Sequence, residues 1–506
     1  MVASGSRAEQ SVLHADAGGR IVVGIHPAHV IGRLARPPAL DLAKLADFAA
    51  LHDDAERTVY DGVRRLPFGT ALHLSPGRAP RVERWWRPAL EEDRSIRPEQ
   101  APGLVRDAVR DAVEASLPAD GDVAATLSGG LDSSMVVGTA AALLGPQGRR
   151  VRALTHRPLP GADEPGGIWE ADDGPYAAAM AATVPGIDLD EVVNLDGTTP
   201  LAADDWMIRR TWHPPFNPAN QVWLNEVVRR AERTGSPVLL TGSSGNATFS
   251  REAAGIVRHL ARSGRLGAVL RQVRARHGAG RPWAGAARDV AREAAPERLL
   301  AWTRARRGIA PGPGRPLGTA DLPFRRELVS DAAIAQLALI EGHLPATRQR
   351  WVDFALNDES RIGAAQNLSE TVWWSDPLSD PEVVALALRL PEESWIASGW
   401  DRGLARSAAE GLVPDRIRWR RTFGAQAADV GLWVAAAEPA YRALLEQLRA
   451  SPSVPQFLDL DALEAGLHRG LTDPATAQLW QAVYGRAFSL GAFAVWYEDE
   501  VLAAAS

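Results

Sequence analysis

The chain has 506 residues, of which 46% are hydrophobic and 23% are charged, and its formal net charge at pH 7 is −6. This composition is ordinary for a globular protein and excludes a mainly disordered or fibrous chain, while the acidic balance gives no reason to expect nucleic-acid binding. No apolar run reaches the ~20 residues of a membrane span, and residues 1–20 contain no apolar signal segment, so we expect a soluble cytoplasmic protein without a membrane span.

Short strands and one helix are expected in the N-terminal part of the chain. Residues 21–25 are rich in β-branched residues, which is typical of a strand, and apolar residues at helical spacing predict a helix over residues 40–51. The alternating stretch 70–74 runs into the turn sequence Ser-Pro-Gly, so residues 81–86 are expected to return as the second strand of a hairpin. Residues 87–100 are rich in charge and proline and are interpreted as a linker.

The middle of the chain alternates between helical and strand patterns. After an amphipathic helix predicted over residues 101–117, strands are expected at residues 123–127, 151–155, 189–193 and 237–241. The helices between them are expected at residues 133–144, 176–184 and 221–233. This rhythm predicts a parallel sheet covered by helices on both faces. From about residue 252 onward the pattern is mainly helical.

The strongest motif follows the first of these strands, where residues 127–134 read Leu-Ser-Gly-Gly-Leu-Asp-Ser-Ser. Two glycines let the backbone approach an anion closely, and the serines and the first amides of the next helix can donate hydrogen bonds to phosphate. The residues in question are Ser128, Gly129, Gly130 and Ser133. Asp132 adds a negative charge to a loop suited to anions, which is explained if Mg²⁺ bridges it to the phosphates. The loop matches neither the P-loop nor the dinucleotide fingerprint.

This motif matches the Ser-Gly-Gly-x-Asp-Ser signature of the ATP-pyrophosphatase enzymes, and the chain from about residue 40 onward resembles the asparagine synthetase family. Residues 57–69 resemble the end of that family's N-terminal glutaminase domain. Residues 377–384 and 389–391 resemble a stretch of its synthetase half. Members of this family adenylate a carboxylate with ATP, release pyrophosphate, and let an amine attack the acyl-adenylate.

The resemblance implies an α/β fold in two parts. Residues 1–92 are expected to form a truncated glutaminase-like region without its cysteine, and residues 93–506 an asparagine-synthetase-like domain. That domain is expected to contain a parallel-sheet ATP-pyrophosphatase core and a helical C-terminal part.

The resemblance also implies how ATP and Mg²⁺ are bound. Leu127, Thr155 and Gly242 correspond to adenine and ribose contacts, in addition to the residues of the glycine loop. Asp132 corresponds to one metal ligand of the family. The second metal carboxylate falls at Asn246, whose carbonyl oxygen is a weaker ligand without charge.

The family's catalytic lysine, which stabilises the leaving pyrophosphate, aligns near Thr422. Lys44 is the only lysine in the chain, so a cationic catalytic role elsewhere must fall to arginine. Arg420 or Arg421 is therefore the candidate replacement, because a guanidinium can stabilise the developing negative charge.

The family's glutamate that acts as a base falls near Trp373. Asp376 and Glu370 are the nearby carboxylates that could substitute for it. An α-amine that attacks an activated ester needs less help from a base than an amide nitrogen does.

The absence of cysteine excludes glutamine hydrolysis by the family's usual nucleophile, so the amine must come from elsewhere. Residues 241–248, 212–223 and 421–429 resemble the lasso peptide cyclases, which close a macrolactam between two groups of one peptide. The implied reaction is adenylation of an Asp or Glu side chain of a linear precursor peptide, followed by attack of its N-terminal amine. A leader-binding protein and a leader protease are the implied partners.

Two other functions remain open at this stage. One is a β-lactam-forming or asparagine-synthetase-like amide ligase that acts on a small molecule. The other is a non-catalytic ATP-binding scaffold, which the departures at Asn246, Thr422 and Trp373 favour. Residues 251–307 carry many arginines and few acids, and they can be either solvated helices or a docking face for an acidic partner.

Overall fold

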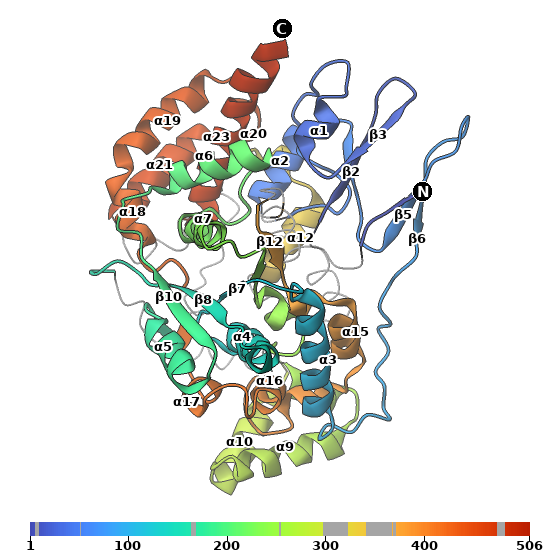
Figure 1. Ribbon diagram of the computed structural model, residues 1–506, viewed down its shortest axis with the longest axis vertical. Coiled ribbons are helices and arrows are strands. Elements are labelled where there is room, and N and C mark those ends of the chain that lie inside the picture. The colour runs from blue at the N-terminus through green and yellow to red at the C-terminus, as the bar shows by residue number, and fades with distance from the viewer. Residues whose placement is uncertain are drawn as a thin grey trace.

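Five parallel strands form the central sheet of the computed structural model, in the order β10-β8-β7-β11-β12 (Figure 1). In that order they span Ile187–Val192, Val151–His156, Val123–Thr126, Val238–Leu240 and Trp373–Ser375. The four predicted strands and the predicted fold class are confirmed. β12 was not predicted, because a three-residue strand is too short for a periodicity and forms here by pairing with β11.

The structure describes residues 1–5, 10–50, 52–162, 168–251, 255–296, 322–340, 367, 371–472 and 481–505. Glu370 and residues 297–307 of the arginine-rich segment lie outside the described residues.

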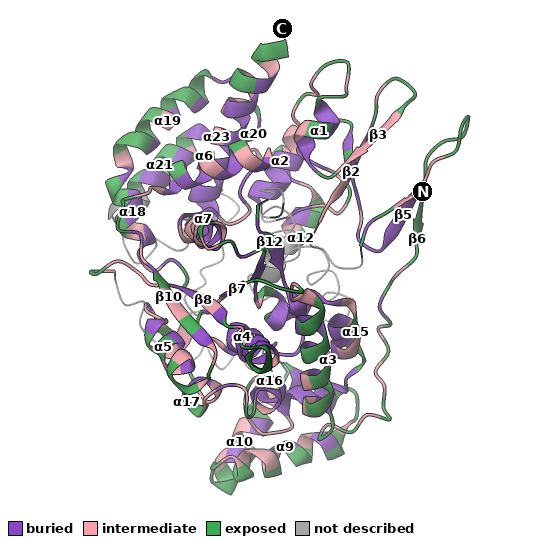
Figure 2. Ribbon diagram, in the orientation of Figure 1, coloured by how far each residue is buried: buried purple, intermediate pink, exposed green. Residues whose placement is uncertain are grey.

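Helices cover both faces of the sheet, and the alternation of side chains along β7 shows how. Val123 and Ala125 belong to the apolar cluster that contains α3 (Ala101–Ser116) and α4 (Leu131–Leu144). Ala124 points the other way, into the cluster that contains α7 (Pro218–Arg233). Helices α5 (Gly174–Thr183) and α6 (Pro200–Thr211) complete this part of the chain. Buried residues gather along the sheet and the inward faces of the helices in Figure 2.

The N-terminal region contains two small antiparallel sheets, ordered β3-β2-β4 and β1-β5-β6. The strands are β1 (Val2–Ala3), β2 (Val12–Asp16), β3 (Ile21–Gly24), β4 (Val63–Leu66), β5 (Thr70–His73) and β6 (Arg81–Arg84). The predicted helix is α2 (Leu42–Ala49), preceded by α1 (Pro27–Ile31), and β5 and β6 form the predicted hairpin. No helix or strand occurs between Arg84 and Ala101, as expected of a linker.

The N-terminal region shares its apolar core with the C-terminal helices. Leu45, Phe48 and Tyr60 pack in one cluster with Phe488 and Phe493. The C-terminal helices of this cluster are α18 (Val430–Ala436), α19 (Glu438–Ala450), α20 (Val454–Phe457), α21 (Leu460–Thr472) and α23 (Arg486–Trp496). The ends of the chain are therefore packed together, and a domain boundary at residues 92 and 93 stays a prediction.

The arginine-rich segment forms helices α8 (Ile256–Arg262), α9 (Leu266–Gly278) and α10 (Trp283–Ala294). Several of its arginines are paired with acids: Arg276 with Glu293, Arg281 with Asp289, and Arg271 with Glu393. This pairing agrees with solvated helices better than with a docking face.

The other described elements are β9 (Trp169–Glu170), α12 (Asp331–Ile340), α15 (Pro381–Arg389), α16 (Gly403–Ala408), α17 (Asp415–Arg418) and β13 (Phe423–Gly424). Across the described ranges, every helix is too short or too polar to cross a membrane.

Asp204 is buried between α6 and α23, where the Ser489 hydroxyl donates to its Oδ2 at 2.7 Å and Oδ1 has no partner among the described residues. Burial raises the pKa of Asp204 well above its usual range. A carboxyl whose pKa rises on folding stabilises the protein at low pH, and that contribution is lost as the pH rises through the folded-state pKa. We therefore expect Asp204→Asn to increase the free energy of unfolding at neutral pH by about 1–3 kcal/mol.

Urea unfolding measures this effect, and the gain should shrink as the pH falls towards the unfolded-state value of 3.8. A variant that is less stable than the wild type at neutral pH would show that the carboxylate is needed in its charged form.

Candidate active site

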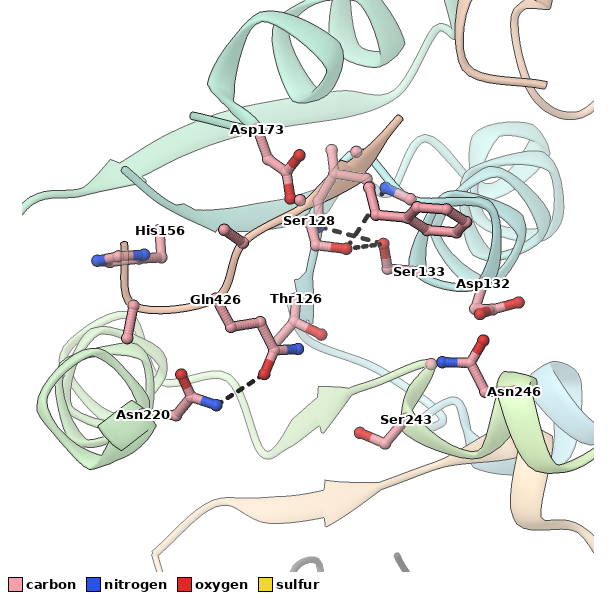
Figure 3. Close-up of a pocket in the computed structure, with 18 of the residues that line it drawn as sticks. Thr126, Ser128, Asp132, Ser133, His156, Asp173, Asn220, Ser243, Asn246 and Gln426 are labelled. Atoms are coloured by element: carbon pink, nitrogen blue, oxygen red, sulfur yellow. Dashed lines mark hydrogen bonds between the residues drawn. The ribbon is translucent and has the colours of Figure 1, made fainter. Parts of the chain in front are cut away.

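A cavity of about 690 Å³ opens at the edge of the sheet where β8, β7 and β11 end (Figure 3). Parallel strands direct their carboxyl ends to one edge, so the loops that follow them meet there. The wall combines the loop after β7, the loop after β11, the start of α7 and residues around β13. Of the predicted site residues, those that line it are Leu127, Ser128, Gly129, Gly130, Asp132, Ser133, Gly242, Asn246 and Arg420.

The glycine loop leads directly into α4, which begins at Leu131, two residues earlier than predicted. Gly130 is the N-cap residue and offers no side-chain cap to the first-turn amides. The Ser133 hydroxyl accepts from the Ser128 amide at 3.1 Å and lies 3.0 Å from the Ser128 hydroxyl. These bonds fix the loop at the N-terminus of the helix, whose first-turn residues line the cavity. Helix N-termini preceded by glycine loops are common phosphate-binding sites.

Position 129 requires glycine for two reasons, which are its backbone conformation and the closeness of its neighbours. Its φ is +67°, and a Cβ there would lie 2.5 Å from Tyr176 Cβ. We expect Gly129→Ala to destabilise the protein by about 1–3 kcal/mol and to weaken ATP binding, because the loop must move away from α5. Gly121→Ala is the matched control, since Gly121 also has positive φ (+81°) but a Cβ added there would meet no atom within 4 Å. Thermal unfolding with and without MgATP measures both effects, and equal losses in the two variants would contradict this expectation.

Asp132 is packed against the loop that follows β11. Its Oδ1 is buried and has no hydrogen-bond partner among the described residues. A Cβ on Gly245 would collide with the Asp132 carboxylate, and one on Gly242 would lie 2.7 Å from the Ser133 amide nitrogen. Burial raises the pKa of Asp132, while the Ser250 hydroxyl and the charge of Arg402 lower it.

The environment of Asp132 suits a divalent cation. Figure 3 shows the exposed Asn246 side chain facing the Asp132 carboxylate. In the part of the chain that the structure describes, no three carboxylate or imidazole groups come together as a metal site. Asp132 and Asn246 would be the protein ligands of a Mg²⁺ ion bound here, and substrate phosphates and water would supply the others, as is usual for this ion.

Arg420 lines the cavity, but its charge is already shared between two acids. Its guanidinium donates to Asp173 at 2.6 Å and to Glu170 at 2.7 Å, and it lies 3.8 Å from the centre of the Tyr176 ring. Its Nε donates to Thr422 Oγ1 at 3.0 Å. Arg420 therefore ties the segment before β13 to the start of α5.

Arg402, which sequence reasoning missed, lines the cavity, whereas Arg421 does not. Arg421 is exposed and lies over the Trp400 ring at 4.8 Å. Arg402 adopts a left-handed conformation (φ 53°) before α16, and its guanidinium lies over the Phe423 ring at 4.7 Å. It is also the cation whose charge acts on Asp132. No motif surrounds Arg402, so only the fold reveals its place.

The family model for asparagine synthase matches residues 104–498, which contain the glycine loop, the whole central sheet and every residue of the cavity wall. The chain belongs to the asparagine synthase family. It is therefore an ATP-dependent ligase by family, and the family typically uses ATP with Mg²⁺. No curated protein matches the chain.

The three positions at which the resemblance predicts departures from the family pattern each have a distinct setting. Asn246 faces Asp132, as described above. The Thr422 hydroxyl accepts from Arg420 and lines the cavity. Trp373 is 39% exposed and lies in β12 at the edge of the sheet. Two of the three departures thus lie on the cavity wall.

Thr155 and Asp376 are not among the residues that line the cavity. The Thr155 hydroxyl is buried without a hydrogen-bond partner among the described residues, while its neighbours Leu154 and His156 reach the cavity. The Asp376 carboxylate accepts from the amides of Ser244 at 2.7 Å and Leu378 at 3.1 Å. Asp376 thereby holds the loop that carries Asn246.

A second wall of the cavity, called the far wall below, lies apart from the glycine loop and is built mainly from α7 and the segment after β13. Asn220 accepts from the Trp223 indole at 3.0 Å and donates to Gln426 at 2.7 Å. His156 stacks on Trp223, with ring centroids 5.7 Å apart. Sequence reasoning singled out the segments 212–223 and 421–429, which carry Asn220, Trp223 and Gln426, but it missed His156. It did not predict that these distant segments form one wall, because they share no motif.

Proposed function

We propose that this asparagine synthase family member is a macrolactam-forming ligase of the lasso peptide cyclase type. It would adenylate the side chain of an Asp or Glu in a linear precursor peptide and join it to the N-terminal amine of that peptide. The observation that carries the proposal is the shape of the cavity, in which a glycine loop suited to phosphate faces a separate wall of polar and aromatic side chains. Such a wall gives an acyl substrate a place beside the nucleotide.

The residues near the glycine loop would bind ATP. The first amides of α4 and the hydroxyls of Ser128 and Ser133 would hold phosphate oxygens. Asp132 and Asn246 would hold Mg²⁺, which when bound supplies positive charge that makes the α-phosphate a better acceptor. Arg402 would stabilise the negative charge that develops on the leaving pyrophosphate.

The peptide would lie against the far wall and the aromatic side chains beside it. Trp169 is 48% exposed, lines the cavity and packs on Phe423 with ring centroids 5.5 Å apart. Aromatic side chains of this kind bind apolar peptide side chains at low entropic cost. Because the chain has no cysteine, the family's usual route from glutamine to ammonia is absent, and in the proposed reaction the amine is that of the peptide itself. A leader-binding protein and a leader protease are proposed partners, and the resemblance to lasso peptide cyclases supports them.

Mass spectrometry of the product tests the proposal. The protein would be incubated with ATP, Mg²⁺ and synthetic linear peptides that begin with glycine and carry Asp or Glu about seven to nine residues later. We expect loss of one water from a peptide, with one AMP and one pyrophosphate formed per ring. Amide formation from a free amino acid and a small amine, without reaction of any peptide, would favour the small-molecule ligase instead.

A further inference from the structure

His156 presents an imidazole to the cavity at the end of β8. Its side chain is 15% exposed, and its ring nitrogens make no hydrogen bond to any described residue. The ring is held flat against Trp223, with 25° between the two planes. Stacking fixes the plane of the imidazole while leaving its edge open to a ligand.

A buried carboxylate, that of Asp429, lies close to this imidazole. Asp429 Oδ1 lies 3.9 Å from His156 Nε2, and the Asp429 side chain is 2% exposed. Asp429 Oδ2 accepts from the Leu159 amide at 3.0 Å, which fixes the carboxylate in place. An acid oriented in this way stabilises the imidazolium that forms when a histidine accepts a proton.

The other side chains of the described cavity wall that could accept a proton already have another partner or another proposed role. Asp132 belongs to the proposed metal site, and Asp173 is paired with Arg420. Asp376 is bonded to two backbone amides outside the cavity. His156 and Asp132 lie on opposite sides of the pocket in Figure 3, with Ser128 and Gln426 between them. An acyl-adenylate formed beside the glycine loop would thus have the metal site on one side and His156 on the other.

We propose that His156 is the general base of the second half-reaction, with Asp429 as its positioning residue. This inference rests on the proposed function. The amine nitrogen attacks the acyl carbon, the new C–N bond forms, and the C–O bond to AMP breaks so that AMP leaves with that electron pair. The proton released from the amine moves to His156 and then to solvent.

The charges around His156 set the direction of the pH dependence. Burial lowers the pKa of His156, and the negative charges of Asp429 and Asp172 partly oppose this effect. Asp172 is itself paired with Arg157, and Trp223, which stacks on the imidazole, is uncharged. The imidazole is therefore neutral at neutral pH, as a base must be.

The test compares the two half-reactions in a His156→Gln variant. ATP–pyrophosphate exchange reports adenylation, and mass spectrometry of a synthetic linear Gly-to-Asp peptide reports ring closure. At a saturating concentration of peptide, where weaker peptide binding has no effect on the rate, we expect exchange to change by less than about twofold, whereas ring closure slows by about 10²-fold or more. Hydroxylamine, which is unprotonated at neutral pH and needs no base, should still capture the acyl-adenylate at close to the wild-type rate.

The pH profile provides a readout that a purely structural role would not change. Ring closure needs the neutral amine in both proteins, so both rates should rise with the ionisation of that amine, with a midpoint near 7.7–8.0. Only the wild type should show a second ionisation at lower pH, that of His156, below which its rate falls more steeply with decreasing pH than the rate of the variant. Asp429→Asn should move this second ionisation to lower pH, because removal of the negative charge lowers the pKa of the imidazole further.

His277→Gln is the matched control, since His277 also stacks on a tryptophan, Trp283, but lies on α9 outside the cavity. Equal slowing of exchange and ring closure in His156→Gln, or no slowing of either, would overturn the assignment of the base. Absence of exchange in the wild type with every peptide would instead overturn the proposed function and this inference with it.

Discussion

Replacement of Asp132 by asparagine is expected to abolish ATP–pyrophosphate exchange, with a loss greater than about 100-fold. Even groups that only support a metal ligand cost about 10- to 100-fold when they are removed, and among the described residues Asp132 is the sole carboxylate at the proposed metal site. The change removes the one negative charge that the described residues would bring to the Mg²⁺ ion and leaves an amide oxygen, which is a weaker ligand.

The same variant should be at least as stable as the wild type without ligands. Burial raises the pKa of Asp132, which means that the charged carboxylate costs stability at neutral pH and that a neutral amide relieves the cost. The melting temperature without ligands should therefore stay the same or rise, while its increase on addition of MgATP should disappear. Asp205→Asn is the control, because Asp205 is exposed on α6 and pairs only with Arg209 among the described residues. Unchanged exchange in Asp132→Asn would refute the metal site.

Arg402→Gln is expected to slow ATP–pyrophosphate exchange by about 10²–10³-fold. This is the usual cost of removing one group that stabilises charge in the transition state. Arg402 is the candidate because it lines the cavity and its charge acts on Asp132. Arg420 also lines the cavity, where its guanidinium joins Glu170 to Asp173.

Arg402→Lys should retain part of the rate, since it keeps the charge but loses the planar guanidinium. Arg281→Gln is the control, because Arg281 pairs with Asp289 on the surface of the arginine-rich segment. A loss of less than about threefold in Arg402→Gln, together with a large loss in Arg420→Gln, would return the catalytic role to Arg420.

The glycine loop and the strands around it could be predicted because local sequence determines them. Residues 127–134 carry their chemistry in one contiguous motif, and the apolar runs before and after it have the length of strands and helices. Helix α6 was not predicted, although it also has a local signal. Thr199 caps it and Pro200 occupies its first turn.

The rest of the site depends on tertiary contacts. β12 is a strand only because Trp373 and its two neighbours pair with β11. His156 is the last residue of β8, and no pattern in its own segment connects it with Asp429 or Trp223. The resemblance placed ATP contacts on Thr155, whereas the alternation of side chains along β8 brings the next residue into the cavity.

The most direct test of the proposed function is ATP–pyrophosphate exchange by the full chain, measured with and without Mg²⁺ and with and without a linear peptide that begins with glycine and carries Asp or Glu. We predict exchange that requires both Mg²⁺ and the peptide and that is lost in Asp132→Asn. No exchange with any peptide, from a protein whose melting temperature nevertheless rises on addition of MgATP, would contradict the proposed function and would favour an ATP-binding scaffold.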